Sequence, residues 1–108
     1  MTYHTYKIPV TQKEYEQIEK AARQKGLKKS AYIRMLLQEA RSIQENYCRS
    51  GIYISYCEES ERRTIYLYTN VQDELHDFFL NMAVRLRLKP GKIAQIYLSD
   101  MLEKEEGK

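Results

Sequence analysis

Two lysines and a serine at the expected start of a helix are the clearest chemical feature of this chain, because they suit the binding of an anion. Lys28, Lys29 and Ser30 stand just before apolar residues at helical spacing, and Ser30 is expected to cap that helix. The free amides and positive dipole end of a helix attract phosphate, whereas lysines placed there without an anion are unfavourable. Lys89 and Lys92 are weaker counterparts near a later helix start. The alternative is ordinary solvated charge.

The residues that could support catalysis or bind a metal are few and far apart in the sequence. His4 and His76 have no carboxylate or cysteine at ligand spacing, and Cys48 and Cys57 lack the spacing of a zinc site. The four glycines are isolated, so the sequence contains no glycine-rich phosphate loop. We therefore expect no enzyme activity, no metal and no cofactor, with both thiols reduced.

The length and charge of the chain limit its class further. Its 108 residues suffice for one domain, or for two very small units that share a core. No apolar run reaches the roughly 20 residues of a membrane-spanning helix, and the polar start does not resemble a signal peptide. The two cysteines are too few for a disulfide scaffold, so we expect a reducing, cytoplasmic setting. Residues 1–50 carry a net charge of +5 and residues 51–108 a net charge of −2. The basic half weakly favours a polyanionic partner.

The first half of the sequence predicts a strand followed by two helices. Apolar and polar residues alternate over residues 3–10, which is the period of a half-buried strand. Thr11 and Glu14 have the spacing of a capping box, which predicts the start of the first helix. Gly26 is expected to end it, because glycine adopts the left-handed cap conformation without a Cβ penalty. The second helix follows Ser30 and runs toward Tyr47.

The second half repeats this order in a divergent form. Residues 64–69 alternate again, with Ile65 and Leu67 on one face and Tyr66 and Tyr68 on the other. Two helices are expected to follow, the first opened by a capping box with shorter side chains at 70–73 and the second by Pro90. Corresponding positions of the two copies have the same separation. Tyr6 and Leu67 in the strands are 61 residues apart, as are Leu37 and Leu98 in the second helices.

A linker, residues 47–62, separates the two copies. Residues 52–57 alternate like a further strand, which would form a hairpin with residues 64–69. The alternative is a plain crossover with few ordered residues.

The first half resembles the ribbon-helix-helix family of DNA-binding proteins. The residues that carry this resemblance are 6–15, 21–22 and 26–34. The second copy departs from the pattern, because Arg87 stands where the turn glycine would be and Pro90-Gly91 replaces the Lys-Ser cap. The resemblance implies a mainly α fold with a short antiparallel β-ribbon, in which a β-α-α unit occurs twice. The first unit would span 1–46 and the second 63–108, with one shared core.

This resemblance also implies where DNA would bind. In the family, two strands pair into an antiparallel ribbon that lies in the major groove, so outward strand residues contact bases. These residues are Thr5, Lys7, Tyr66 and Tyr68, flanked by the basic Arg62 and Arg63. The phosphate contacts would come from Lys28, Lys29, Ser30, Lys89 and Lys92. The strands would pair within one chain as a pseudo-dimer or, alternatively, between two chains as a homodimer.

The tandem form resembles conjugation accessory proteins of the TraY kind, and Tyr15, Ala22, Gly26 and residues 32–34 are similar to mobilisation proteins of the MobC kind. The resemblance implies a relaxosome accessory that binds double-stranded DNA at an origin of transfer, with a relaxase or other conjugation protein as partner. One alternative is a transcriptional repressor or antitoxin-like autoregulator of the same fold. An alternative from another class is a protein–protein interaction module that lost DNA contact.

Overall fold

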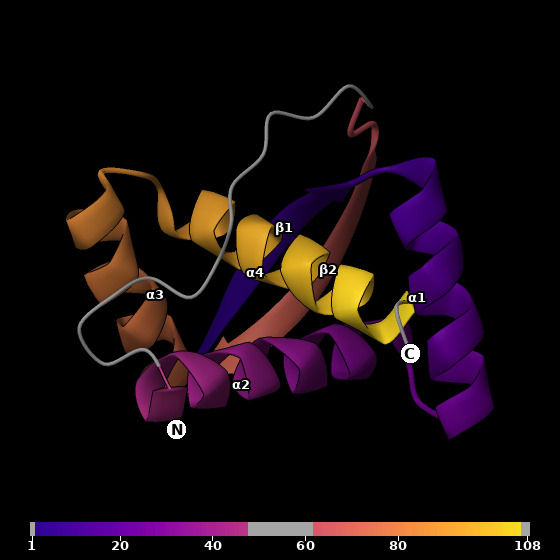
Figure 1. Cartoon of the computed structure of the whole chain (residues 1–108), viewed down its shortest axis with the longest axis horizontal. Coiled ribbons are helices and arrows are strands. Elements are labelled where there is room, and N and C mark those ends of the chain that lie inside the picture. The colour runs from indigo at the N-terminus through magenta and orange to yellow at the C-terminus, as the bar shows by residue number, and fades with distance from the viewer. Residues whose placement is uncertain (1, 48–61, 107–108) are drawn as a thin grey trace.

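The computed structural model describes residues 2–47 and 62–106, which form a mainly helical protein with one two-stranded antiparallel sheet (Figure 1). The elements are β1 (Tyr3–Val10), α1 (Gln12–Lys25), α2 (Lys29–Tyr47), β2 (Ile65–Gln72), α3 (Asp73–Leu86) and α4 (Pro90–Glu106). The further strand predicted at 52–57 lies outside the described residues. Across the described ranges, no helix combines the length and apolar character that a membrane span requires.

The local signals around α1 are confirmed. The Thr11 side chain accepts from the Glu14 amide at 3.1 Å, and the Glu14 carboxylate accepts from the Thr11 amide at 3.0 Å, which is the predicted capping box. Gly26 ends the helix with φ +68° in the left-handed region. Arg87, which ends α3, adopts the same region with φ +57° although it carries a Cβ. A non-glycine residue is strained in this conformation.

Two boundaries differ from the sequence expectation. α2 begins at Lys29, so Ser30 lies inside its first turn and is not the cap. The capping box predicted at 70–73 is wrong, because β2 continues to Gln72, and Gln72 makes no side-chain cap bond to α3. The physical reason is burial, since Thr69 and Val71 continue the inward series of β2 and keep the chain extended and paired.

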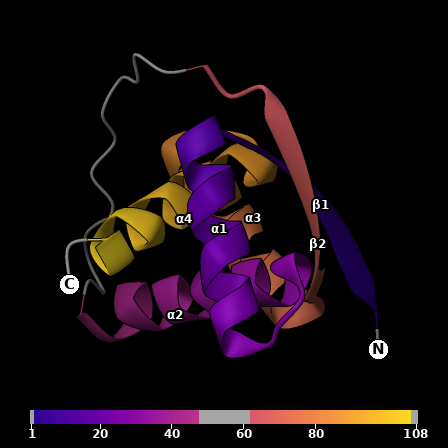
Figure 2. The same cartoon turned by 90° about the vertical axis from the view of Figure 1, so that its right-hand side faces the viewer.

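The sheet is a ribbon of two antiparallel strands in which Tyr3 lies opposite Gln72 and Val10 lies opposite Ile65. Figure 2 shows both strands on one side of the molecule and the helices on the other. α2 packs against β2 and α4 packs against β1, while α2 and α4 also contact each other. One face of the ribbon is therefore covered by helices and the other is open.

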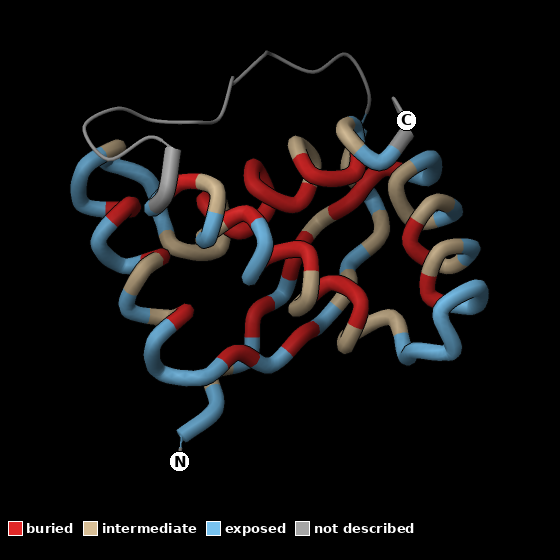
Figure 3. Tube along the Cα trace, turned by 60° about the horizontal axis from the view of Figure 1, so that its bottom comes forward, coloured by how far each residue is buried: buried red, intermediate tan, exposed pale blue. Residues whose placement is uncertain are grey.

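The core lies between the ribbon and the helices. One cluster of buried hydrophobic residues includes members from all six elements, with Ile8, Ile33, Phe79 and Tyr97 among the fully buried side chains. Buried positions recur along both strands and along the central helices (Figure 3). Because β1 and β2 bury their inner faces in the same cluster, their register is set by this core.

Candidate nucleic-acid interface

The open face of the ribbon brings together the four predicted base-contacting residues. Thr5 and Lys7 come from β1, and Tyr66 and Tyr68 come from β2, and all four are exposed. They point away from the helices because their neighbours on the same strands, such as Ile8, are buried in the core and side chains alternate along a strand. The geometry thus provides one continuous surface of hydrogen-bonding, cationic and aromatic groups.

The side chains on this face contact one another across the strands. The Nζ atom of Lys7 lies 4.4 Å from the centroid of the Tyr66 ring, a cation–π contact. The Thr5 hydroxyl donates to Oδ1 of Asn70 at 2.8 Å. These contacts orient side chains that would otherwise sample many rotamers, which lowers the entropy lost if they bind a ligand.

Asn70 and Gln72 belong to the same open face and were missed by the sequence interpretation. Both are exposed, and they lie opposite Thr5 and Tyr3 respectively. The available signal is the alternation that continues from Thr69, which points inward, to Asn70, which points outward, whereas the sequence pattern predicts a strand that ends at Thr69 and a helix cap from Asn70. Asparagine and glutamine carry both a donor and an acceptor and are suited to reading base edges.

The start of α2 lies beside the ribbon, where it carries the predicted phosphate-contacting residues Lys28, Lys29 and Ser30. The buried Thr69 of β2 donates from its hydroxyl to the Ser30 carbonyl at 2.8 Å, which fixes the start of α2 against the ribbon. The first turn of α2 contains no acidic residue. Lys28 is exposed, while Lys29 lies 5.2 Å from the ring of Tyr15.

A shallow open hollow of ≈590 Å³ lies at this helix start. Its lining residues are Glu19, Ala22, Arg23, Leu27, Lys28, Lys29 and Ser30. Three of these residues are basic, and Glu19 partly balances them through contacts with Arg23 at 3.1 Å and Lys29 at 3.8 Å. The hollow is therefore net positive and polar, a surface that an anion can approach.

The start of α4 has a similar backbone arrangement with weaker charge. The Ile93 amide donates to the Lys89 carbonyl at 3.1 Å, as the Tyr32 amide donates to the Lys28 carbonyl at 3.0 Å. Lys89 is exposed and Lys92 is half-buried, and the first turn of α4 contains no acidic residue.

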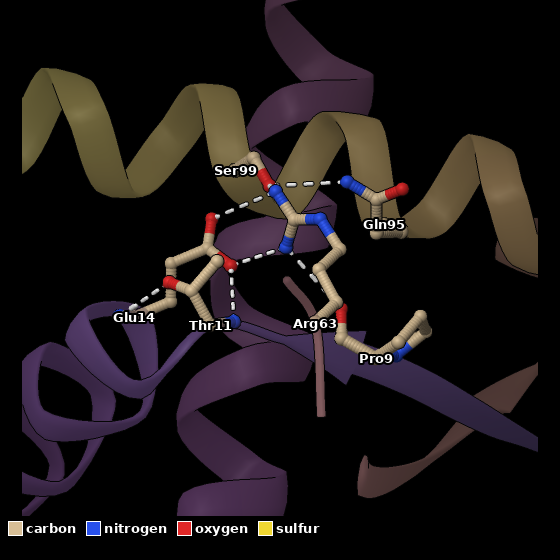
Figure 4. A network of polar contacts seen from close by, with 6 residues as sticks. All are labelled: Pro9, Thr11, Glu14, Arg63, Gln95 and Ser99. Atoms are coloured by element: carbon tan, nitrogen blue, oxygen red, sulfur yellow. Dashed lines mark hydrogen bonds and ion pairs between the residues drawn. The ribbon is translucent and has the colours of Figure 1, made fainter. Parts of the chain in front are cut away.

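The two flanking arginines lie in different environments. Arg62 is exposed, whereas the Arg63 guanidinium is nearly buried and donates to both carboxylate oxygens of Glu14 (Figure 4). Arg63 also donates to the Pro9 carbonyl at 3.3 Å and to the Ser99 hydroxyl at 3.0 Å. Because these protein groups occupy its guanidinium, we assign Arg63 to the fold and not to DNA contact.

Two histidines that are distant in sequence lie together at the end of the ribbon where Tyr3 is opposite Gln72. The rings of His4 and His76 stack with centroids 3.8 Å apart, and His4 Nε2 lies 2.7 Å from a carboxylate oxygen of Asp73. The Tyr6 hydroxyl hydrogen-bonds to Nδ1 of His76 at 2.7 Å, and burial raises the pKa of Tyr6 to about 12. Among the residues with described side chains, no group of three or more His, Cys, Asp or Glu is arranged to hold a metal ion.

The fold and this face define a small, mainly helical protein with an exposed antiparallel ribbon. Comparison with known families adds one finding: residues 2–47 match the family model described as NikA-like, Mobilization protein NikA. The matched residues contain β1, α1 and α2, which is less than half of the chain. No curated protein and no solved structure matches the chain. The match supports a relationship of the first half to mobilisation accessory proteins.

Proposed function

We propose that this chain is a sequence-specific binder of double-stranded DNA, of tandem ribbon-helix-helix type, that acts as an accessory protein in plasmid mobilisation. The observation that carries the proposal is the antiparallel ribbon, whose outer face is exposed and whose inner face packs against the helices. A two-stranded ribbon fits the width of the DNA major groove, where each base pair presents a distinct pattern of donors and acceptors.

The outer-face residues have the chemistry that base reading requires. Lys7 donates hydrogen bonds that suit the O6 and N7 acceptors of guanine, and Thr5 bonds a base edge or contacts a thymine methyl group. Tyr66 and Tyr68 are 51% and 55% exposed, so bases or sugars can reach their rings. The tyrosines also suit a protein partner, and the DNA-binding experiment below separates the two.

The arrangement of the elements supports two related units within one chain. The helix α1 spans Gln12–Lys25 and α3 spans Asp73–Leu86, so both ends are shifted by the 61 residues found in the sequence. Gly26 and Arg87, which end these helices in the same left-handed conformation, have this offset too. In a ribbon whose two strands are related by a two-fold axis, the residues at the axis lie opposite their own counterparts in the other unit.

The centre of the ribbon meets this requirement. Lys7 and Tyr68 are 61 residues apart and lie directly opposite each other in the register. This coincidence supports an intramolecular pseudo-dimer over pairing between the first units of two chains. Light scattering at low protein concentration should therefore report a folded particle near 12.9 kDa. A dimer that unfolds upon dilution would support the homodimer instead.

Phosphate contacts are assigned to the helix starts on either side of the ribbon. Lys28, Lys29 and Ser30 at α2, with Lys89 and Lys92 at α4, combine positive charge with helix dipoles that attract anions. The mobilisation role rests on the family match of residues 2–47. A relaxase or another conjugation protein is the proposed partner at an origin of transfer.

The experiment is duplex binding as a function of salt, using a duplex selected by this protein from a random library. If the four lysines of the helix starts contact phosphates, log K should fall against log salt with a slope of about −3 to −4. Lys7→Ala should reduce discrimination between the selected duplex and one with a changed central base pair. A salt-independent affinity, or failure to select any duplex, would overturn the proposal.

A further inference from the structure

The two halves of the ribbon carry different chemistry on their open face. Lys7 and Tyr68 lie opposite each other at the centre, with the pair Thr5 and Asn70 two positions to one side. The pair two positions to the other side is Pro9 and Tyr66. In a ribbon with true two-fold symmetry these two flanking pairs would be identical.

The Thr5–Asn70 pair presents a donor next to an acceptor. The Thr5 hydroxyl gives its proton to Asn70 Oδ1 at 2.8 Å, so the hydroxyl oxygen offers lone pairs while the Asn70 amide nitrogen keeps its two donors. The major-groove edge of adenine presents an acceptor, N7, beside a donor, the N6 amino group. Asn70 is thus suited to donate to N7 while the Thr5 oxygen accepts from N6.

The backbone of Asn70 is held from two sides. Arg34 of α2 donates from Nη1 to the Asn70 carbonyl at 3.2 Å. The neighbouring Thr69 is buried and donates to the Ser30 carbonyl at 2.8 Å. A reading residue held in this way contributes more to specificity, because less conformational freedom is lost when it binds.

The other half offers no such hydrogen-bonding pair. Pro9 has neither an amide proton nor a polar side chain, and the Tyr66 ring lies under the Lys7 ammonium group, 4.4 Å from its centroid. This contact draws the Lys7 ammonium group toward the Tyr66 half of the ribbon. A cation prefers the acceptors of guanine, and a ring and a proline suit the methyl group of thymine.

On the basis of the proposed function, we infer that the chain binds an asymmetric DNA site in one orientation. The Thr5–Asn70 pair reads an adenine in one half-site, and Lys7 with Tyr66 reads the other half-site through guanine or thymine. Asn70 is the specificity-determining residue of the first half-site.

The test uses the selected duplex and two palindromes, each built by duplicating one of its half-sites. Both palindromes should bind about 5- to 150-fold more weakly than the asymmetric duplex, since each forces one half of the ribbon onto the wrong bases. Asn70→Ala should weaken binding of the asymmetric duplex by a similar factor and remove discrimination at the adenine, with discrimination in the other half-site unchanged.

Asn81→Ala is the matched control, because Asn81 is an exposed asparagine on α3, away from the ribbon. The side chain of Asn70 is exposed, so its variant should fold, which an unchanged melting temperature would verify. A palindrome that binds as tightly as the selected duplex, or retained adenine discrimination in Asn70→Ala, overturns the inference alone. Absence of salt-dependent binding to every duplex overturns the proposed function itself, so the two failures are distinguishable.

Discussion

Arg63 and Glu14, which are 49 residues apart in the sequence, form an ion pair whose side chains are only 11% and 13% exposed. Glu14 belongs to the first turn of α1, and Arg63 precedes β2, so the pair joins the two halves of the chain. The same Glu14 carboxylate accepts from the Thr11 amide at 3.0 Å. One side chain therefore completes a helix cap and neutralises a nearly buried guanidinium.

Glu14→Ala should lower the free energy of unfolding by about 2–4 kcal/mol, because it removes the cap and leaves the Arg63 charge nearly buried without its counterion. Urea denaturation measures this change. Glu16→Ala is the control, since Glu16 is an exposed acidic residue of the same helix and should change stability by less than about 0.5 kcal/mol. Equal effects of the two substitutions would show that the ion pair contributes little.

Arg87→Gly should stabilise the protein by about 1 kcal/mol, because glycine relieves the strain of a Cβ in the left-handed region. Gly26→Ala should destabilise it by about the same amount. Apart from the chain neighbours of Gly26, no atom lies within 4 Å of the position that a Cβ would take, so this loss would reflect backbone strain and not a clash. Thermal unfolding of both variants measures these two changes in stability. A lower melting temperature for Arg87→Gly would contradict the prediction.

The double variant Lys28→Ala, Lys29→Ala should weaken DNA binding at low salt by a similar factor for every duplex. It should also make the slope of log K against log salt shallower by about 2, since each phosphate contact contributes about 1 to that slope. Lys20→Ala, at an exposed lysine of α1, is the control and should leave the slope unchanged. An unaltered slope in the double variant would remove these lysines from the interface.

Stability should fall as pH rises from 10 to 12, in part because of Tyr6. Burial raises the pKa of this hydroxyl from 10.0 to about 12 in the folded protein, so the unfolded chain loses the proton first as pH rises. Ionisation then stabilises the unfolded state and lowers the free energy of unfolding. Well below pH 10 the hydroxyl is protonated in both states, and its contribution is constant. Over this interval the loss amounts to about 2 kcal/mol at most.

Tyr6→Phe tests this assignment. The variant should lose about 1 kcal/mol near neutral pH, since the hydrogen bond to His76 is removed, and should show a shallower decline above pH 10. The comparison is made by urea denaturation at several pH values. A decline as steep as that of the unmodified protein would show that other tyrosines cause the loss of stability above pH 10.

The sequence by itself determined the local features, because each depends on residues that are neighbours along the chain. Thr11, Glu14 and Gly26 mark the limits of α1 through hydrogen bonds and a backbone conformation that involve only adjacent turns. The alternation of residues 3–10 likewise placed Thr5 and Lys7 outward, since successive side chains of a strand point to opposite faces.

Only the tertiary structure decided which distant residues meet. The contacts of Arg63 with Glu14 and of Asn70 with Thr5, and the stacking of His4 on His76, join residues from different elements. No local spacing encodes them, because they depend on the register of β1 against β2. That register is set by the burial of both inner faces in one core, where a shift by one residue would expose every buried side chain of a strand.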